Sequence, residues 1–403
     1  MLPTKFCALS ASLVCVLAGS ALAQETSCPR NYSSLTRAIN TFLAANPTLN
    51  GCSLVVNMDG VEVYARKFRD VGPDTTIANI ASATKALSAV TVMTLVDDGV
   101  LELNDRAATF ISAFGSGLEA TITLRECFSH TSGLLADNAC LNERFNTLEN
   151  CANQIAAAGL RTQPSGFLVE PGTDFYYGGA SMQVGGRMAE VAAAAAWVDL
   201  FQTKLRGPMS LTSVQFGSTS NPRIAGGASS SARDYAKVFQ MLLDDGMYNG
   251  ARILSPASVR AMEIDQTRGV PITSSPAPDG VRYGLGLWRD IVDDSGRAIQ
   301  LSDQGAFGFS PWYDTTRQIV GVLAVQNTLE NVRGLVTQLQ DLCRKIHDSS
   351  TADLNYDGFV TGDDYDGFAD AFLIGDEFAD FDDNGFVNGD DYDQFVRAFE
   401  LGC

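Results

Sequence analysis

Segments with the pattern of β-strands stand at both ends of residues 30–346, and the sequence between them is mostly helical in pattern. Residues 52–57 and 61–64 flank Met58-Asp59-Gly60 and predict a hairpin. Residues 283–327 contain short alternating runs separated by turn residues, which predict two or three antiparallel strands. A sheet has to bury a face against other elements. We therefore expect a mixed α/β fold, in which an antiparallel sheet assembled from distant segments is flanked by helices and interrupted by a helical insert.

Helical periodicity is clearest in three segments of this body. Residues 30–46 place apolar side chains at helical spacing, and residues 81–99 are rich in Ala, Leu and Val and end in Asp-Asp-Gly. Residues 335–346 close the body with a further helix. The second segment has the composition of a buried helix and the stop signal of a helix end.

The first residues have the pattern of an export signal. Lys5 precedes an apolar run, and small residues end in Ala21-Leu22-Ala23, so residues 1–23 are expected to be a signal peptide. We therefore expect a periplasmic, extracellular or surface-associated protein. No later apolar run reaches 18 residues, so no membrane span is predicted. Disulfides persist outside the cytoplasm, and the preferred bridge joins Cys140 and Cys151.

The charge of the chain is unevenly distributed. Sixteen acidic residues and one basic residue lie between Asp348 and Cys403, so this short segment carries most of the net charge of −19. Nucleic-acid binding is disfavoured because it requires a basic surface. The body is nearly balanced in charge, and the acidic segment needs its own explanation.

A serine hydroxyl needs a base before it can act as a nucleophile. The chain has two histidines, His130 and His347, and no G-x-S-x-G or H-E-x-x-H motif, so a Ser-His-Asp triad and a catalytic zinc site are both disfavoured. Ser82 and Lys85, in contrast, lie one helical turn apart at the head of the buried helix. Burial would lower the lysine pKa and allow a neutral amine to take the serine proton. The alternative is a helix-capping serine beside a solvated lysine.

Five segments read together resemble the serine β-lactamase-related family, in particular the class C branch that includes penicillin-binding proteins, D-aminopeptidases and esterases. The segments are IASATKALSAVTVMTLVDDGVLELND (80–105), ITLRECFSHTSGL (122–134), PGTDFYYGG (171–179), AGGASSSARDYAKVFQMLLDDG (225–246) and GAFGFSPW (305–312). The resemblance implies a β-lactamase/transpeptidase-like fold and an acyl-enzyme on Ser82. It also implies a proton shared by Lys85 and Tyr177, an oxyanion hole from the backbone N–H groups of Ser82 and Ala306, and no cofactor for catalysis.

Two departures from the family pattern bear on the substrate. The asparagine of the family's Y-x-N element is Gly179, and its K-T-G or H-x-G element reads Asp303-Gln304-Gly305. We expect Asp303 to face the substrate and to repel a carboxylate, which disfavours penicillins and D-Ala-D-Ala peptides. The remaining expected substrate-pocket residues are Gly305, Phe307 and Trp312, with Trp288 and Phe309 as further aromatic candidates.

The acidic segment is an internal repeat with an offset of 27 residues, in which 13 of 23 positions are identical. Each copy places oxygen side chains at loop positions 1, 3, 5, 9 and 12, a glycine at 6 and a backbone carbonyl at 7, which is the pattern of a calcium loop. Aromatic residues at helical spacing follow each loop and predict a small core. The repeat resembles a type I dockerin, which implies two Ca²⁺ ions and a possible cohesin-like partner. The expected ligands are Asp353, Asn355, Asp357, Phe359, Thr361 and Asp364, then Asp380, Asp382, Asn384, Phe386, Asn388 and Asp391.

The sequence thus predicts a signal peptide (1–23), a serine hydrolase domain (24–347), a linker (348–352) and a dockerin-like calcium module (353–403). The expected activity is that of an esterase or amidase-like hydrolase acting on a small ester, an amide or a cell-wall-derived compound. Two alternatives stay open. One is a β-lactamase or D-Ala-D-Ala carboxypeptidase, and the other is a non-catalytic protein that binds penicillin or peptidoglycan.

Overall fold

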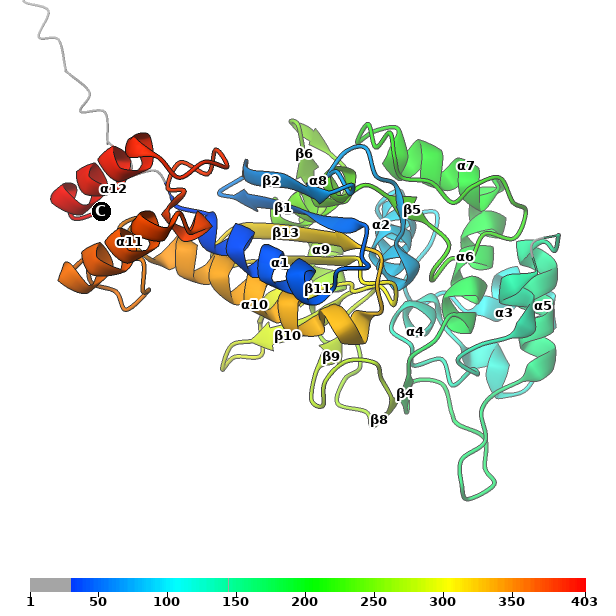
Figure 1. Cartoon of the computed structure of the whole chain (residues 1–403). Helices are drawn as coiled ribbons and strands as arrows, with labels where there is room; N and C mark the ends of the chain where they lie inside the picture. The colour runs from blue at the N-terminus through cyan, green and yellow to red at the C-terminus, as the bar shows by residue number, and fades with distance from the viewer. Residues whose placement is uncertain (1–29, 144) are drawn as a thin grey trace, which may run out of the picture.

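A central sheet of seven strands organises the computed structural model, which describes residues 30–143 and 145–403 (Figure 1). The order of the strands across the sheet is β2-β1-β13-β12-β11-β10-β9. Their bounds are β1 Gly51–Met58, β2 Val61–Arg69, β9 Arg282–Tyr283, β10 Trp288–Val292, β11 Ala298–Ser302, β12 Ser310–Asp314 and β13 Ile319–Val325. The predicted signal peptide lies outside the described residues.

The pairing of β1 with β13 joins the two ends of the body. The strands are antiparallel, and Leu54 lies opposite Leu323 while Cys52 lies opposite Val325. Both strands are buried almost throughout, because helices cover both faces of the sheet. The expectation of one antiparallel sheet built from distant segments is therefore confirmed.

Two helices from opposite ends of the body cover one face of the sheet. They are α1 (Ser33–Ala45) and α10 (Leu329–Asp348), which run side by side in Figure 1. Their apolar stripes form one core with the strands, in which Leu35, Ile39, Leu323 and Leu339 are fully buried. The first predicted helix is confirmed, whereas the closing helix begins earlier than the predicted residue 335 because Thr328 caps it through a hydrogen bond from the Asn331 N–H.

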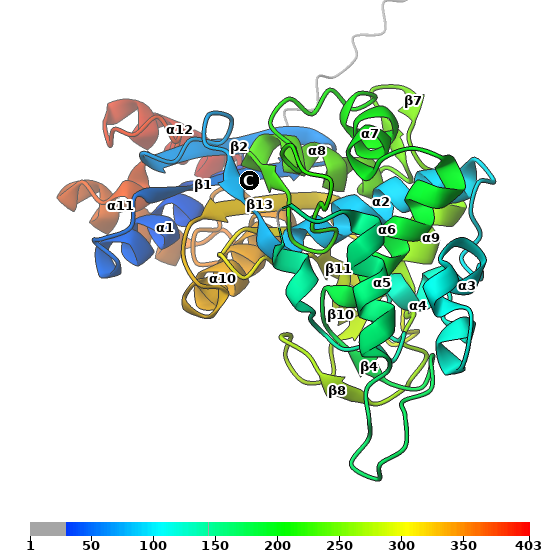
Figure 2. The same cartoon turned by 90° about the vertical axis from the view of Figure 1, so that its right-hand side faces the viewer.

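The opposite face carries α8 (Ala232–Leu243) and, beyond it, the helical insert (Figure 2). The buried helix predicted at 81–99 is present as the short 3₁₀ turn η1 (Ala81–Ala83) followed by α2 (Thr84–Asp97). Nearly every residue of α2 is buried, so α2 is the central helix of this core. The other helices of the insert are α3 Ala107–Phe110, α4 Leu124–Phe128, α5 Leu148–Ala158, α6 Ala180–Ala193, α7 Trp197–Phe201 and α9 Pro256–Glu263.

Short elements complete the body. The paired short strands are β3 Ala78–Asn79 with β5 Ser229–Ser230, β4 Phe175–Tyr176 with β8 Ile272–Ser274, and β6 Met247–Tyr248 with β7 Ala251–Arg252. Short helical turns are η2 Ser112–Phe114, η3 Leu118–Thr121, η4 Ala139–Asn142 and η5 Gln202–Arg206. The predicted disulfide joins Cys140 and Cys151. The prediction of two or three strands over 283–327 was wrong, because five short strands fit there between turns and each finds a partner only in the assembled sheet.

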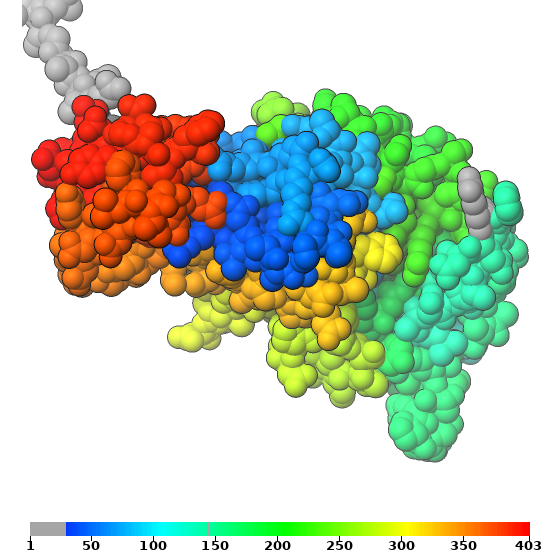
Figure 3. Space-filling view, viewed as in Figure 1, coloured from blue at the N-terminus to red at the C-terminus, as the bar shows by residue number. Residues whose placement is uncertain are grey.

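The acidic segment forms a separate pair of helices, α11 (Gly362–Ile374) and α12 (Gly389–Leu401), with the turn η6 (Glu377–Ala379) between them. The rings of Phe368 and Phe395 stack at 4.0 Å between centroids in the centre of their core, which confirms the aromatic core expected from the repeat. Figure 3 shows this segment lying at one end of the body, beside α1. Within the part of the chain that the structure describes, no helix is long and apolar enough to cross a membrane.

Candidate functional site

Ser82 lies in the turn η1 that leads into α2, where the helical insert meets the sheet. The preceding residue, Ala81, has φ 46°, a left-handed conformation that costs a residue with a side chain some energy. Lys85 follows one turn later, and its Nζ donates to Ser82 Oγ at 3.1 Å. The structure therefore brings the two predicted residues into direct contact, with the serine partly accessible and the lysine buried.

The surroundings of Lys85 favour its neutral form. The side chain is 2% exposed, and its other contact is to the backbone oxygen of Ala225 at 2.8 Å. Burial lowers the pKa of Lys85 to about 7, with Asp303 opposing this effect and Arg223 adding to it. An amine with such a pKa can accept a proton near neutral pH.

Tyr177 stands on the other side of Lys85. Its backbone N–H donates to Ser274 O at 3.0 Å, next to the pairing of β4 with β8, and Lys85 Nζ is 4.5 Å from the centre of its ring. Burial raises the pKa of Tyr177, and the charge of Asp303 raises it further, whereas the Ser82 hydroxyl lowers it. The phenol therefore stays protonated at neutral pH, and Lys85 is the better proton acceptor of the two.

The backbone around Ser82 and Ala306 leaves two N–H donors free. Among the described residues, neither of these N–H groups donates a hydrogen bond. The two segments touch, because a Cβ at Gly305 would lie 2.1 Å from the backbone oxygen of Ile80. Only glycine allows this approach, so the arrangement has the chemistry of an oxyanion hole.

Asp303 is not positioned as the sequence predicted. Its side chain is completely buried, and its Oδ2 accepts a hydrogen bond from the Ala86 N–H at 2.7 Å. The carboxylate thus caps the first turn of α2 from behind the nucleophile, where the partial positive charge of the helix end favours an anion. Burial raises its pKa, and Lys85 opposes that effect. The expectation that Asp303 faces and repels a substrate carboxylate is wrong, because the strand directs this side chain into the protein.

Two of the aromatic candidates are also in the core. Trp312 is 1% exposed and packs with α1 and α10, on the face of the sheet opposite to α2, so it does not line the site. Phe309 is fully buried in the core on the α2 side. Phe307 is 52% exposed in the loop that carries Ala306, and Trp288 lies 5.2 Å from Tyr177 between ring centroids. These last two are the aromatic candidates that the structure places near the site.

Gly179 has no side chain, and a Cβ added there would lie only 3.0 Å from the Leu141 side chain. The Gly179 N–H donates to Ala136 O at 2.7 Å. The position therefore offers no amide to a substrate, as the sequence indicated.

His130 lies beside the site, although no sequence motif indicated this. Its ring lies 4.7 Å from that of Tyr177, and its Nδ1 is 3.3 Å from Ser181 Oγ. Burial lowers the pKa of His130 well below its usual value, so the imidazole is neutral. The imidazole packs against the Tyr177 ring.

The two acidic loops form the second candidate site. In the second loop, Asp380, Asp382 and Asp391 each offer a carboxylate oxygen, and these oxygens lie within 4.8 Å of one another. Gly385, at loop position 6, has φ 94°, as the sharp turn of such a loop requires. The donors are all oxygens, so this loop fits a hard cation such as Ca²⁺.

The first loop has the same backbone. Gly358 has φ 91°, and Asp353 accepts hydrogen bonds from the N–H groups of Asp357 and Gly358. Asp364 accepts from the Leu354 N–H at 2.9 Å, as Asp391 accepts from the Phe381 N–H at 2.8 Å. The two copies of the repeat therefore fold alike, and the remaining predicted ligands lie in these loops.

Comparison with known proteins gives four findings. The model of the protein family described as Beta-lactamase matches residues 38–341. Penicillin-binding protein 4 of Amycolatopsis lactamdurans is 25% identical over 296 residues, which cover 60% of this chain and 76% of that protein. A solved structure from Bacteroides dorei DSM 17855, provisionally described as a β-lactamase, is 26% identical with a TM-score of 0.66, covering 76% of this chain and 99% of that one.

A further solved structure has the same fold. EstCE1, described as a hydrolase with promiscuous acyltransferase activity, has a TM-score of 0.61 and 18% identity, and the match covers 76% of this chain and 98% of that one. At this identity the likeness concerns the fold alone.

Proposed function

Since this chain belongs to the β-lactamase family, whose members include serine hydrolases, we propose that it is itself a serine hydrolase that works through an acyl-enzyme on Ser82. The observation that carries the proposal is the contact between Lys85 Nζ and Ser82 Oγ at 3.1 Å, with the lysine buried. Proximity of a neutral amine to the hydroxyl is what activation of a serine requires.

The proposed reaction has two steps. Lys85 takes the Ser82 proton as Oγ attacks the substrate carbonyl, and the N–H groups of Ser82 and Ala306 stabilise the oxyanion. The leaving group receives a proton from Lys85, with Tyr177 bridging between them, and the acyl chain stays on Ser82. A water molecule then repeats the attack, and its proton takes the same route. The acid is released and the serine is restored.

We favour esters and simple amides as substrates. Neither position 303 nor position 179 offers the site a cation or an amide for binding an acylamino carboxylate, because Asp303 is buried and Gly179 has no side chain. The alternative is a β-lactamase or D-Ala-D-Ala carboxypeptidase, which the likeness to penicillin-binding protein 4 supports.

The experiment compares a short p-nitrophenyl ester with a chromogenic cephalosporin, using the wild type and Ser82→Ala. We expect the wild type to hydrolyse the ester faster, and Ser82→Ala to lose at least 10³-fold in kcat/KM. Ester turnover that survives Ser82→Ala would contradict the nucleophile assignment. Turnover of the cephalosporin alone would favour the β-lactamase alternative over the esterase. Tight penicillin binding without any turnover would favour the non-catalytic alternative.

For the C-terminal segment we propose two Ca²⁺ ions, held by the loop oxygens of 353–364 and 380–391. The all-oxygen donor set and the duplicated aromatic core support this proposal. Export by residues 1–23 and docking of the module to a cohesin-like protein are further proposals that rest on the sequence pattern. The ions would order the loops and take no part in catalysis.

A further inference from the structure

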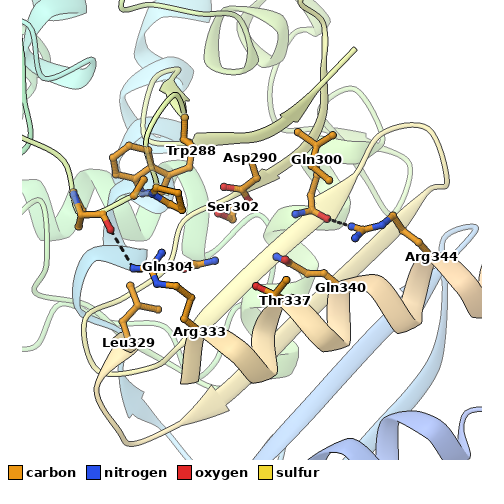
Figure 4. A pocket seen from close by; sticks show the side chains of 15 residues that line it. Trp288, Asp290, Gln300, Ser302, Gln304, Leu329, Arg333, Thr337, Gln340 and Arg344 are labelled. Carbon is orange, nitrogen blue, oxygen red and sulfur yellow. Dashed lines mark hydrogen bonds between the residues drawn. The ribbon is translucent and has the colours of Figure 1, made fainter. Parts of the chain in front are cut away.

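A cavity of about 290 Å³ lies between α10 and the strands β10 and β11, next to the loop that carries Ala306 (Figure 4). Gln304 and Trp288 line its end nearest to the site, and the Trp288 ring contacts Tyr177. Leu329, on the opposite wall, donates its N–H to the backbone oxygen of Ala306 at 3.0 Å. The cavity therefore begins beside the groups that would hold the reacting carbonyl.

Three polar atoms in the lining have no hydrogen-bond partner among the described residues. They are Asp290 Oδ2, Ser302 Oγ and Gln340 Nε2. Ser302 is fully buried and Gln340 is 7% exposed. Figure 4 shows Asp290 and Ser302 from the strands facing Gln340 from α10 across the shared space. A buried polar atom without a partner is destabilising, so several of them around one cavity indicate that a polar group fills it.

The two arginines of the lining already have partners. Arg344 Nη1 donates to Gln300 Oε1 at 2.6 Å, and Arg333 Nη2 donates to Pro276 O at 3.1 Å. Of the three unpartnered atoms, the Ser302 hydroxyl lies beside Asp290 and lowers the pKa of that carboxyl, which burial raises to about 6. The groups left for a ligand are therefore the Asp290 Oδ2 oxygen and the Gln340 amide. The other walls are apolar, from Pro276, Ala277, Pro278, Val281 and Ile291.

The lining carries charges of both signs. Asp290 would repel a carboxylate that Arg333 and Arg344 attract, and the arginines would repel an ammonium group that Asp290 attracts, so neither ion finds an unopposed partner. A hydroxyl or a carboxamide instead carries a donor and an acceptor close together. It can satisfy the Asp290 oxygen and the Gln340 amide at once.

We propose that this cavity is a substrate subsite for a neutral hydrogen-bonding group, a hydroxyl or a carboxamide, which donates to Asp290 Oδ2 and accepts from Gln340 Nε2. The proposal rests on the hydrolase function, because it places one end of the substrate beside the oxyanion donors. It adds a determinant of substrate choice that lies outside the Ser82, Lys85 and Tyr177 cluster.

The test uses two series of esters with the full chain. In the first, p-nitrophenyl esters carry hexanoic, 6-hydroxyhexanoic or 5-carbamoylpentanoic acid. In the second, butyrate esters carry hexan-1-ol, hexane-1,6-diol or 6-hydroxyhexanamide. The first series tests occupation by the acyl side and the second by the alcohol side. The comparison is Gln340→Leu against Gln338→Leu, an exposed glutamine on the same helix, outside the cavity lining.

Two readouts separate the subsite from the chemistry. The dissociation constants of each ester are measured by calorimetry on Ser82→Ala protein, alone and combined with each glutamine variant, and kcat/KM is measured with an active Ser82. Each readout gives a preference for the polar ester over the apolar one, as the ratio of their kcat/KM values or of their binding affinities. In one of the two series, Gln340→Leu is expected to reduce this preference by about tenfold in both readouts. Gln338→Leu should leave that ratio unchanged.

An unchanged ratio in both series would overturn the subsite and indicate that the cavity holds water alone. Absence of turnover with any ester would instead contradict the hydrolase function. In that case the calorimetric ratios still decide the subsite, because they need no catalysis.

Discussion

At the scale of single residues, the site depends on how three buried groups share charge and protons. Lys85 is the amine whose pKa burial lowers to about 7, Tyr177 is the phenol that burial keeps protonated, and Asp303 is the acid behind them, whose own pKa burial raises. Asp303 is the unusual member, because it caps α2 and lies close enough to Lys85 to raise its pKa. We therefore expect it to act as a positioning residue.

The pH profile tests this arrangement. Because the neutral amine is the active form, kcat/KM should rise as the pH increases through about 7, the pKa of Lys85. Asp303→Asn removes the charge that raises this pKa, so the rising limb should move to lower pH, while Asn can still accept from the Ala86 N–H. Asp294→Asn, in the exposed turn after β10, is the control. An unmoved limb in Asp303→Asn would show that Asp303 is protonated and acts by hydrogen bonding alone.

Tyr177 and Tyr176 form a matched pair of neighbours. Tyr176 packs its ring against the Arg161 guanidinium at 3.9 Å, whereas Tyr177 lies beside Lys85. Tyr177→Phe removes the hydroxyl that would pass the proton to the leaving group, so kcat should fall by about 10²–10⁴-fold. Tyr176→Phe should stay within a few-fold of the wild type. Equal effects of the two substitutions would contradict the assignment of the catalytic tyrosine to 177.

At the scale of elements, the register of the sheet decides which side chains reach the site. Trp312 lies opposite Gly321, and its ring covers that glycine on the face that carries α1 and α10. The next residue, Tyr313, points to the other face and packs in the core with α8. A shift of the strand register by one residue would move each side chain of β12 to the opposite face of the sheet. The burial of Trp312 is therefore fixed by strand pairing.

Two glycines test this packing. A Cβ at Gly321 would lie 2.1 Å from the Trp312 ring, so Gly321→Ala should lower the free energy of unfolding by about 1–3 kcal/mol. Gly334, in the interior of α10, has free space at its Cβ, so Gly334→Ala should raise that free energy by up to about 1 kcal/mol. Urea denaturation of the full chain measures both. An unchanged free energy of unfolding in Gly321→Ala would show that the Trp312 indole moves aside without cost.

At the scale of the whole molecule, the C-terminal segment contacts the body through both of its loops and the turn η6. Arg66 Nη2 forms an ion pair with Asp383 Oδ1 at 3.0 Å, and Ser33 Oγ donates to Phe378 O at 3.1 Å. Tyr356 from the first loop donates to Ser34 Oγ at 2.9 Å. The acidity of the chain is thus concentrated in a small folded unit at one end of a nearly neutral body.

Calcium should stabilise this unit. At a Ca²⁺ concentration of 100 times Kd, each site should add about 2.7 kcal/mol to the stability of the loaded segment, so its thermal transition should rise and fall back after chelation. Asp391→Asn should weaken the effect, because Asp391 belongs to the converging carboxylates. Asp393→Asn, on the exposed side of α12, should not. An unchanged transition at millimolar Ca²⁺ would contradict the calcium loops.

The sequence by itself determined what local spacing controls. Ser82 and Lys85 meet because residues three apart share one face of a helix, and the aromatic repeat after each loop builds its small core for the same reason. The bridge between Cys140 and Cys151 also follows from nearness along the chain. The sheet of distant strands could be predicted in outline, whereas the number of its strands could not.

Only the tertiary structure decided which face each strand residue takes and which distant groups share a space. Asp303 directly follows β11, and its side chain lies on the same face of the sheet as that of Leu301, toward α2, where it is buried. Ser302, between them, points to the opposite face and lines the cavity beside α10. The cavity joins two strands and a helix that the sequence keeps apart. Strand pairing over long sequence separation sets these positions, and no local pattern encodes it.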